Sequence, residues 1–444
     1  MRLKSITVGG FKNLFRTKML LDRVIAVVSP NNYGKSNLLE AIDFGTDFIS
    51  ASPKERQLMM AWVRGIPITN DLENEDYVFE VEFHDQTLGE YQYVKYGYCF
   101  SWYKDNGSGQ RIIDEWLETR PSESVRYTSF LKRAEGKYRK SKDTSAYRLI
   151  NVDDNQLIIE MLSAIQDIAI QPVLQSIRRI DYHVCASLDL CDRFQAAPIE
   201  YVKQAEDGGV TFDDEDVPRA LYQLKQHNPE QFNLFEEAVY SLFPEIKAIS
   251  VQSYELKIEE GHVEHFEYVD GKKVAIIDNN DEGNIPFRIR DEIYRLLISS
   301  QYFNQPINMS VMSTGTKRIF WLLANVFIAT SKKISCIGVE ELETSIHPKL
   351  LKSLLEILDE ILEDNSIILS SHSPYLIQYI KPERIYVGIP NDKGIAVFKR
   401  VKRSNIRNLV RASHDNGMSV GEYLFELMSS DQDDSEILSF YLED

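Results

Sequence analysis

Hydrophobic and polar residues in the first 50 positions follow two different periods. Residues 24–28 form a short apolar run of mostly β-branched side chains, which predicts a buried strand. From residue 35 onward the apolar side chains recur at helical spacing, which predicts a helix carrying Leu38, Leu39, Ala41, Ile42 and Phe48. The loop between strand and helix reads Ser29-Pro30-Asn31-Asn32-Tyr33-Gly34-Lys35-Ser36. We expect the rest of the chain to be organised around this strand, loop and helix.

A period of two residues marks the flanking segments as strands. Segments 3–11, 17–21 and 23–29 predict a small β-meander, and segments 77–85 and 91–105 predict further strands. In the first of these longer strands a polar face alternates with an apolar one, Val78, Glu80 and Glu82 against Phe79, Val81 and Phe83. Residues 105–110 predict a hairpin loop.

From residue 112 to 242 the pattern is mostly helical, in four segments, 112–120, 156–177, 218–227 and 229–243. No sustained heptad crosses this region, so we expect no long coiled coil. A strand pair is predicted at 248–260 and 265–277. The acidic stretch 206–216 is predicted to be a solvated loop. The Asp/Asn-rich stretch 278–284 lacks the terminal Glu spacing of a calcium loop and is not expected to bind calcium.

Longer apolar segments return in the last third of the chain. Residues 316–330 predict a helix that is apolar nearly all round and therefore buried. Residues 334–341 and 366–374 predict buried strands. The amphipathic segment 348–364 between them predicts a helix that starts at Pro348, a favoured first-turn residue. Residues 384–400 predict a closing hairpin, and the acidic tail 430–444 keeps enough apolar residues to dock on the domain.

The chemistry of the first loop depends on its Gly-Lys-Ser ending. Backbone N–H groups at a helix N-terminus bind phosphate, Lys35 places a positive charge on the β and γ oxygens, and the Ser36 hydroxyl ligates Mg²⁺. In the pattern G-x-x-x-x-G-K-[ST] the first glycine is replaced here by Ser29. The alternative interpretation is an ordinary turn between strand and helix.

Acidic and imidazole groups follow two later strands. Glu340 and Glu341 follow the strand at 334–339. The first acid could bind Mg²⁺ or a water on that ion, and the second could act as general base for the attacking water. His372 follows the next strand, where a neutral imidazole could hydrogen-bond the γ-phosphate or that water. The alternatives are solvated strand-end carboxylates and a structural histidine. The stretch Ser313-Thr314-Gly315 precedes the buried helix and fits either a phosphate contact or an N-cap, and His347 fits a helix start.

Composition narrows the class of protein. Of the 444 residues, 43 % are hydrophobic and 27 % are charged, as in soluble globular proteins. The sequence contains neither a membrane-length apolar run nor an N-terminal signal peptide. The four cysteines show no zinc spacing, which favours a reducing cytoplasm.

The formal net charge of −18 excludes indiscriminate binding of nucleic acid, so any such contact must come from a local basic patch. Two clusters are candidates, each also explicable as solvated surface charge. The first is Lys132, Arg133, Lys137, Arg139, Lys140 and Lys142, and the second is Lys399, Arg400, Lys402, Arg403, Arg407 and Arg411.

Together these motifs resemble the ABC-type ATPase head of the SMC/RecF class. More narrowly, the chain is similar to bacterial ATPases related to the ATPase half of overcoming-lysogenisation-defect nucleases. The resemblance rests on "ITVGGFKNLF", "VVSPNNYGKSNLLEAI", "MSTGTKR" as signature loop, "IGVEELETSIHP" and "SSHSP", over the first 50 and last 150 residues. It implies an α/β P-loop ABC-type ATPase head with a mixed sheet, an antiparallel β subdomain and a mostly helical insert. The expected parts are 1–111, 112–295 and 296–444.

The resemblance also implies roles for individual residues, with ATP and Mg²⁺ as ligands. The phosphates would be held by Asn31, Asn32, Gly34, Lys35, Ser36 and Asn37, with Lys12 and Asn13 nearby. Ser36 and Glu340 would hold Mg²⁺, and Glu341 and His372 would be the catalytic residues. Ser313 and Gly315 would contact the γ-phosphate of nucleotide on a second subunit, so that ATP closes a dimer. Gln171 and Gln175 are candidates for the family's further glutamine.

Three hypotheses on function follow. The first is an ATPase that gates a separate effector protein, as in anti-phage defence, because we expect neither a coiled-coil arm nor a nuclease domain in this chain. The second is a RecF-like DNA repair ATPase that uses the basic clusters. The third is a nucleotide-binding scaffold with little hydrolysis, since Ser29 and Glu340 depart from the family pattern.

Overall fold

The structure is a computed structural model that describes most of the chain. It leaves out residues 105, 166–167, 186–193, 195–198, 202–215, 256–264, 270–271, 277–286, 290–291, 333, 363, 390–392, 430–431 and 444. The described residues form two compact units, Met1–Ser187 with Lys333–Asp444, and Leu188–Lys332. These breaks differ from the divisions at 111 and 295 that the sequence suggested.

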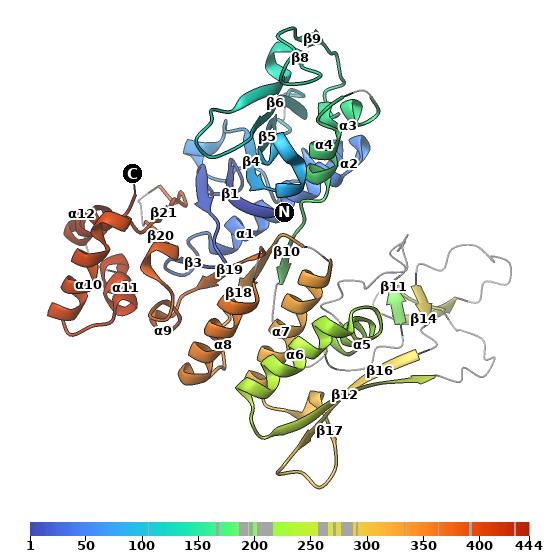
Figure 1. Cartoon of the computed structure of the whole chain (residues 1–444), viewed down its shortest axis with the longest axis vertical. Helices are drawn as coiled ribbons and strands as arrows, with labels where there is room; N and C mark the ends of the chain where they lie inside the picture. Colours follow the sequence, from blue (N-terminus) through green and yellow to red (C-terminus); the bar gives the residue numbers. More distant parts are fainter. Residues whose placement is uncertain are drawn as a thin grey trace. The chain divides into compact units, whose positions relative to one another are not determined.

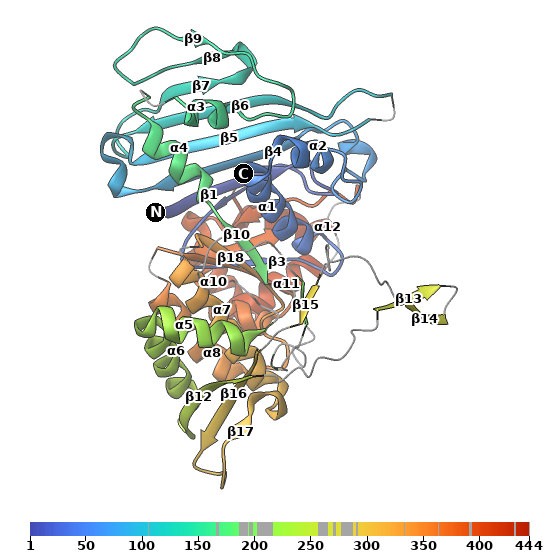
Figure 2. The same ribbon diagram turned by 90° about the vertical axis from the view of Figure 1, so that its right-hand side faces the viewer.

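The first unit contains an antiparallel sheet of eight strands in the order β2-β1-β4-β5-β6-β7-β8-β9. Its strands are β1 (Arg2–Gly9), β2 (Thr17–Leu20), β4 (Tyr77–His84), β5 (Tyr93–Ser101), β6 (Arg111–Arg120), β7 (Thr128–Lys132), β8 (Lys137–Tyr138) and β9 (Arg148–Leu149). The alternation predicted for β4 is confirmed, because Phe79, Val81 and Phe83 are buried while their neighbours are partly exposed. Figure 2 shows the long strands side by side with helices α3 and α4 across them.

Two predictions in this region are wrong. Residues 112–120 form strand β6 rather than a helix, because Leu117 and Thr119 face the core while Trp116 and Glu118 face outward, a period of two. The first three strands do not form one meander either. Strands β1 and β2 pair with each other, whereas β3 (Val24–Val28) joins a different sheet.

The second sheet of this unit has the order β10-β18-β19-β3-β20-β21. All neighbours up to β20 pair in parallel, and β21 closes the sheet antiparallel. Besides β3, its strands are β10 (Tyr182–Cys185), β18 (Cys336–Glu340), β19 (Ser366–Ser371), β20 (Ile385–Gly388) and β21 (Phe398–Arg400). The strands predicted at 24–28, 334–341 and 366–374 and the closing hairpin are thus confirmed (Figure 1). Buried parallel strands of this kind need helices on their faces.

Helix α1 (Lys35–Ser50) begins where predicted and packs between the two sheets of the first unit. The hydroxyls of Tyr77 and Tyr98 donate hydrogen bonds of 2.7 Å to its carbonyls at Ala41 and Gly45. The other helices of the unit are α2 (Pro53–Met59), α3 (Ile158–Ser163), α4 (Gln171–Arg178), α8 (Pro348–Ile361), α9 (Pro374–Ile377), α10 (Ile406–Asp415), α11 (Val420–Ser429) and α12 (Gln432–Tyr441). Short 3₁₀ turns lie at η1 (Asn70–Leu72), η2 (Gln86–Tyr91), η3 (Arg133–Glu135), η6 (Pro382–Arg384) and η7 (Arg403–Asn405). The single helix suggested by 156–177 is therefore two short ones.

In the second unit the helices α5 (Val217–His227), α6 (Pro229–Leu242) and α7 (Thr314–Lys332) pack together. For example, the ring centroids of Phe235 and Phe320 lie 6.1 Å apart. The predicted burial of α7 is confirmed, since every side chain from Lys317 to Ala329 is buried. Beside the helices lie β12 (Ile246–Glu255), β16 (Glu292–Ser300), β17 (Ile307–Asn308) and η5 (Met309–Val311). The shorter strands form two pairs. Strand β11 (Ile199–Tyr201) pairs with β15 (Phe287–Ile289), and β13 (His265–Val269) pairs with β14 (Lys272–Ile276).

The predicted pairing of segments 248–260 and 265–277 is wrong. Strand β12 pairs with β16, which lies much later in the sequence, while β13 and β14 form a hairpin of their own. Most of the loop at 206–216 and all of the loop at 278–284 lie outside the described residues. Within the described part of the chain, no helix is long and apolar enough to cross a membrane.

Candidate functional site

Three neighbouring parallel strands end at the same edge of the second sheet. The backbone register aligns Val27 of β3 with Ser370 of β19, and Ser370 with Glu340 of β18. Ligands of open parallel sheets bind at the carboxyl ends of the strands. This edge therefore gathers the loop after β3, the pair Glu340-Glu341 after β18 and His372 after β19.

The loop after β3 leads into α1 without a side-chain cap. Gly34 stands at the N-cap with φ 122°, and no acidic residue occupies the first turn. A Cβ at Gly34 would lie 2.8 Å from the Cβ of Ala396, so both conformation and space require glycine here. Ser36, in the first turn, is exposed. The uncapped N–H groups and the helix dipole favour an anion at this position.

Ser29 stands where the phosphate-loop pattern has its first glycine. Its side chain is completely buried, and its φ is not among the positive ones of the described chain. Space for it comes from Gly388 of β20, where a Cβ would approach the Ser29 Cβ to 2.6 Å. The serine is therefore accommodated without backbone strain, and Gly388 is a site-building residue that the sequence analysis missed because no local pattern marks it.

The Lys35 ammonium is hydrogen-bonded to its own loop, and the charges of three carboxylates act on it. Its Nζ donates to the carbonyls of Ser29 at 2.9 Å and Pro30 at 3.2 Å. Burial lowers the pKa of Lys35, and the negative charges of the acids Glu341, Glu343 and Glu340 oppose that shift. The lysine of the loop and the acids after β18 thus belong to one electrostatic site.

Glu341 and His372 meet across the ends of β18 and β19. The His372 Nδ1 lies 3.5 Å from the Glu341 Oε1, and the two side chains are 42 % and 43 % exposed, so solvent reaches both. The Glu341 N–H donates to the Ser370 carbonyl at 2.9 Å, which fixes the start of the turn.

Glu341 also has a left-handed backbone, with φ 47°. Among the described residues other than glycine, this property is shared by Lys12, Asn32, Gln110 and Ser345, with φ between 49° and 66°. Such conformations are unfavourable by about 1–3 kcal/mol each and persist where the surroundings enforce them, often at functional sites.

Lys12 and Asn13 are tied to the loop and to α1. The Asn13 amide donates to the Tyr33 carbonyl at 3.2 Å and accepts from the Asn37 amide at 2.7 Å. Lys12 forms an ion pair with Glu40, one turn further along α1. Both residues are thus beside the loop, as expected, and Asn37 contributes by bracing Asn13.

The donor set of the edge fits Mg²⁺. A serine hydroxyl, one or two carboxylates, phosphate oxygens and water are the ligands that this ion takes in nucleotide sites. Ser36 and Glu340 would hold it. The Oε2 atom of Glu343 is buried without a hydrogen-bond partner among the described residues, so the edge has negative charge to offset. No group of three or more His, Cys, Asp or Glu side chains within the described chain could hold a metal by itself.

The remaining predicted residues lie elsewhere. Ser313 belongs to the second unit, where its Oγ accepts from the Thr316 N–H at 3.2 Å and caps the start of α7. Gly315 lies in the first turn of that helix. The Gln171 amide donates to three carbonyls at the end of α3, which is a structural arrangement. His347 accepts from the Lys349 N–H and caps α8, as predicted.

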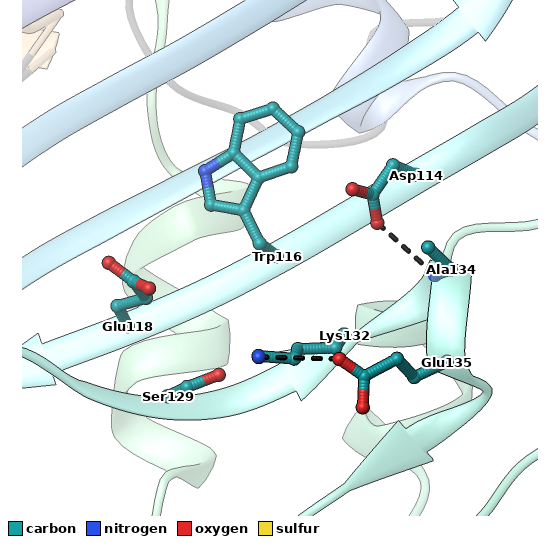
Figure 3. A pocket seen from close by; sticks show the side chains of 7 residues that line it. All are labelled: Asp114, Trp116, Glu118, Ser129, Lys132, Ala134 and Glu135. Atoms are coloured by element: carbon teal, nitrogen blue, oxygen red, sulfur yellow. Dashed lines mark hydrogen bonds and ion pairs between the residues drawn. The ribbon is translucent and has the colours of Figure 1, made fainter.

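The first basic cluster is largely neutralised by acids and carbonyls. Lys132 and Lys137 both pair with Glu135, at 3.3 and 3.1 Å, and Lys142 pairs with Glu90. Lys132 also lines a cavity of about 210 Å³ together with Asp114, Trp116, Glu118, Ser129, Ala134 and Glu135 (Figure 3). Three carboxylates in this cavity disfavour a polyanion.

The second basic cluster is different. Arg400 is held by the Glu383 carbonyl at 2.6 Å. Arg403, Arg407 and Arg411 are exposed along η7 and α10, and none of them forms an ion pair within the part of the chain that the structure describes.

Comparison with protein families gives one match. Residues 215–378, less than half of the chain, match the family described as "AAA domain, putative AbiEii toxin, Type IV TA system". This stretch includes Ser313, Glu340, Glu341 and His372 and supports an ATPase of the AAA type. Comparison with curated proteins finds no match.

Three solved structures that the chain resembles are heads of SMC proteins. A Smc head bound to the C-terminal winged-helix domain of ScpA is 12 % identical with TM-score 0.49, covering 92 % of this chain and all of that one. The SMC head domain of Thermotoga maritima is 13 % identical with TM-score 0.41, covering 90 % and 100 %. A Smc head with an extended coiled coil, bound to the C-terminal domain of ScpA from Pyrococcus furiosus, is 11 % identical with TM-score 0.44, covering 93 % and 99 %. Likenesses this weak carry no information about activity.

Proposed function

We propose that the chain binds ATP with Mg²⁺ at the carboxyl edge of the parallel sheet and hydrolyses it. The strongest support is the register of the parallel strands, which aligns the ends of β3, β18 and β19 at one edge, where His372 lies 3.5 Å from Glu341. A phosphate-binding lysine, acids for metal and water, and an imidazole are groups that can serve phosphoryl transfer to water.

In this proposal Lys35 exchanges its two loop carbonyls for the β- and γ-phosphate oxygens, while Asn31, Asn32, Gly34, Ser36 and Asn37 surround the phosphates. Ser36 and Glu340 hold Mg²⁺. When bound, the ion offsets the repulsion between the triphosphate and the nearby carboxylates. Glu341 accepts the proton of the attacking water, and His372 donates a hydrogen bond to the γ-phosphate or orients the water.

We further propose that two copies close over two ATP molecules. Ser313 and Gly315 of one copy would then contact the γ-phosphate held by the other, and Lys12 would stand beside the nucleotide. In the cytoplasm this closure would gate a separate effector protein, with anti-phage defence as the proposed setting. The role of Ser313 is supported by its exposure, together with that of Thr314, at the start of α7.

The test of closure is the size of the protein in solution. The Glu341→Gln variant, which should bind ATP without consuming it, is expected to run as a dimer with ATP and Mg²⁺ and as a smaller species without them. Lys35→Ala with the same ligands is the control and should stay unchanged in size. A Glu341→Gln variant that binds ATP and keeps one size throughout would contradict closure.

A second candidate function is ATP-dependent binding of nucleic acid through the second basic cluster. It is favoured by Arg403, Arg407 and Arg411, which are exposed and form no ion pair with any described residue, on a chain of net charge −18. Replacing Arg407 and Arg411 by Gln should lower the slope of log affinity against log salt by about 2, one for each lost phosphate contact. The matched control is Lys132→Gln with Lys137→Gln, which should leave the slope unchanged. No DNA or RNA binding at low salt would remove this candidate.

A further inference from the structure

A buried serine hydroxyl joins the two loops that carry Glu341 and His372. The Ser371 Oγ donates to the Glu343 Oε1 at 2.7 Å and accepts from the Ser373 N–H at 3.0 Å. Ser371 is fully buried at the end of β19, directly before His372. Glu343 stands two residues after Glu341. A short bridge of hydrogen bonds thus spans the loop after β18 and the loop after β19.

The turn that carries Glu343 is held at several points. The Thr344 N–H donates to the Glu341 carbonyl at 3.1 Å, and the Ile346 N–H donates to the Glu343 carbonyl at 3.2 Å. Leu342 between the two acids is completely buried and anchors the turn in the core. The backbone of Glu343 is therefore held in place, and its bond to the Ser371 hydroxyl restrains the end of β19 as well.

The two oxygens of the Glu343 carboxylate differ, because only Oε1 accepts a hydrogen bond from a described residue. Its Oε2 is buried and has no hydrogen-bond partner within the described chain. An unsatisfied buried acceptor destabilises the fold, so its presence calls for a reason other than stability. The charge of Glu343 also acts on Lys35, together with the charges of Glu341 and Glu340.

We propose that Glu343 is a positioning residue: through the Ser371 hydroxyl it holds the loop of His372 against the loop of Glu341, so that the imidazole and the catalytic carboxylate stay within reach of each other. This inference rests on the proposed ATP hydrolysis. Charge-assisted hydrogen bonds from a hydroxyl to a carboxylate are among the stronger ones, and a small misplacement of a reacting group lowers a rate steeply. The bridge should therefore affect turnover and leave nucleotide affinity alone.

The experiment measures kcat for ATP hydrolysis and the Kd for ATP in the full chain. Ser371→Ala and Glu343→Ala each remove the bridge and should lower kcat about tenfold, with the Kd changed by less than about twofold. The double variant should be no slower than the slower of the two single variants, because both remove the bond between Ser371 and Glu343. Glu343→Gln keeps an acceptor oxygen for Ser371 and should recover most of the lost rate.

Ser370→Ala is the matched control. Ser370 is the adjacent, equally buried serine of β19, and no hydrogen bond of its hydroxyl is found within the described chain, so its loss should leave kcat and Kd unchanged. Melting temperatures show whether each variant is folded. If Glu343→Ala does not fold, the comparison of Ser371→Ala with Ser370→Ala decides alone.

Three results would overturn the proposal: an unchanged kcat in Ser371→Ala, rate losses that multiply in the double variant, or a loss of affinity in place of turnover. A wild-type chain that hydrolyses no ATP would refute the proposed function and this inference together. A wild-type chain that hydrolyses ATP at the same rate as Ser371→Ala would refute the inference alone.

Discussion

Two clusters of ionisable groups in the first unit differ in how completely their charges are paired. The strand-end cluster consists of Lys35, Glu340, Glu341, Glu343 and His372. The sheet cluster consists of Tyr96 and Glu115 on strands β5 and β6 of the antiparallel sheet, with Arg56, Arg133 and Glu160 on α2, η3 and α3. Both combine acids and bases at partly or fully buried positions, yet only one has the properties of a site.

The sheet cluster is saturated with hydrogen bonds. Arg56 is fully buried and binds Glu160 with two bonds of 2.9 and 2.8 Å, and its other donors reach the Phe48 carbonyl at 2.7 Å and the Ile49 carbonyl at 3.1 Å. These carbonyls lie at the end of α1, and Glu160 lies on α3. The arginine therefore cross-links two helices and leaves nothing to bind a ligand.

Glu115 does the same for the start of α3. Its carboxylate accepts from the N–H groups of Ile158 at 2.6 Å and Ile159 at 3.1 Å, and from the Tyr96 hydroxyl at 3.2 Å. Burial raises the pKa of Glu115 to about 7, although these N–H groups and Arg133 oppose the shift.

In the strand-end cluster, two groups keep bonding capacity unused within the described chain. The Lys35 ammonium donates there only to carbonyls of its own loop, and the Glu343 Oε2 has no hydrogen-bond partner, while Glu341 and His372 are open to solvent. The comparison teaches that a strongly perturbed carboxyl such as Glu115 can be purely structural. Unfilled bonding capacity at an accessible edge distinguishes the site better than a shifted pKa does.

The largest effect is expected from a substitution that disrupts the sheet cluster. Arg56→Ala leaves the Glu160 carboxylate and two carbonyls without a partner and should lower the free energy of unfolding by about 3–5 kcal/mol. Lys54→Ala, on the same helix and exposed, is the control with an expected change below about 0.5 kcal/mol. Thermal unfolding of the two variants compares them. Equal melting temperatures would show that Arg56 is not the cross-link described here.

The next largest effect is expected from a substitution that disrupts the strand-end cluster and leaves the stability of the fold unchanged. Lys35→Ala removes the charge that should bind the β- and γ-phosphates, and phosphate release should fall at least about a hundredfold. The melting temperature should hardly change, because the lysine binds only its own loop. Lys349→Ala, an exposed lysine at the start of α8, should retain the wild-type rate. A Lys35→Ala variant with full activity would place the chemistry elsewhere.

The smallest effect is the pH dependence of stability that Glu115 of the sheet cluster contributes. Because the pKa of Glu115 is higher in the folded chain, at about 7, than its usual 4.5, the folded state binds the proton more tightly. The contribution of Glu115 to stability is therefore greatest below pH 4.5 and is lost as pH rises to 7, by about 2 kcal/mol between pH 5 and 7. Glu115→Gln removes this dependence.

Melting temperatures of wild type and Glu115→Gln between pH 5 and 7.5 measure the difference. The two curves should converge toward pH 5 and separate toward neutral pH, with the variant gaining relative to the wild type. Parallel curves would mean that Glu115 is ionised throughout the range.

Much of the fold could be predicted where a pattern is long and local. Strand β3, the loop, α1, β18, α8 and β19 were predicted because apolar runs and helical spacing identify them without tertiary contacts. Pairing partners could not be predicted in this way. That β3 leaves β1 and β2 for another sheet, and that β12 pairs with the distant β16, depends on contacts that the local sequence does not encode.

The candidate site divides in the same manner. Lys35, Ser36, Glu340, Glu341 and His372 stand at recognisable positions after predicted strands, and the structure brings these strand ends to one edge. Gly388, Ser371 and Glu343 carry no such mark. Gly388 matters because it makes room for Ser29, and Glu343 because a serine from another strand donates to it. Both contacts join segments far apart in the sequence and form only when the chain folds.

The most direct test of the ATPase proposal is phosphate release by wild type and Glu341→Gln at equal, measured occupancy with ATP and Mg²⁺. If Glu341 takes the proton from water, the wild type should release phosphate and the variant at least about a hundredfold less, with similar affinity for ATP. Equal rates in the two proteins, whether near zero or high, would contradict catalysis at this edge, and equal near-zero rates with intact binding would identify a nucleotide-binding scaffold instead.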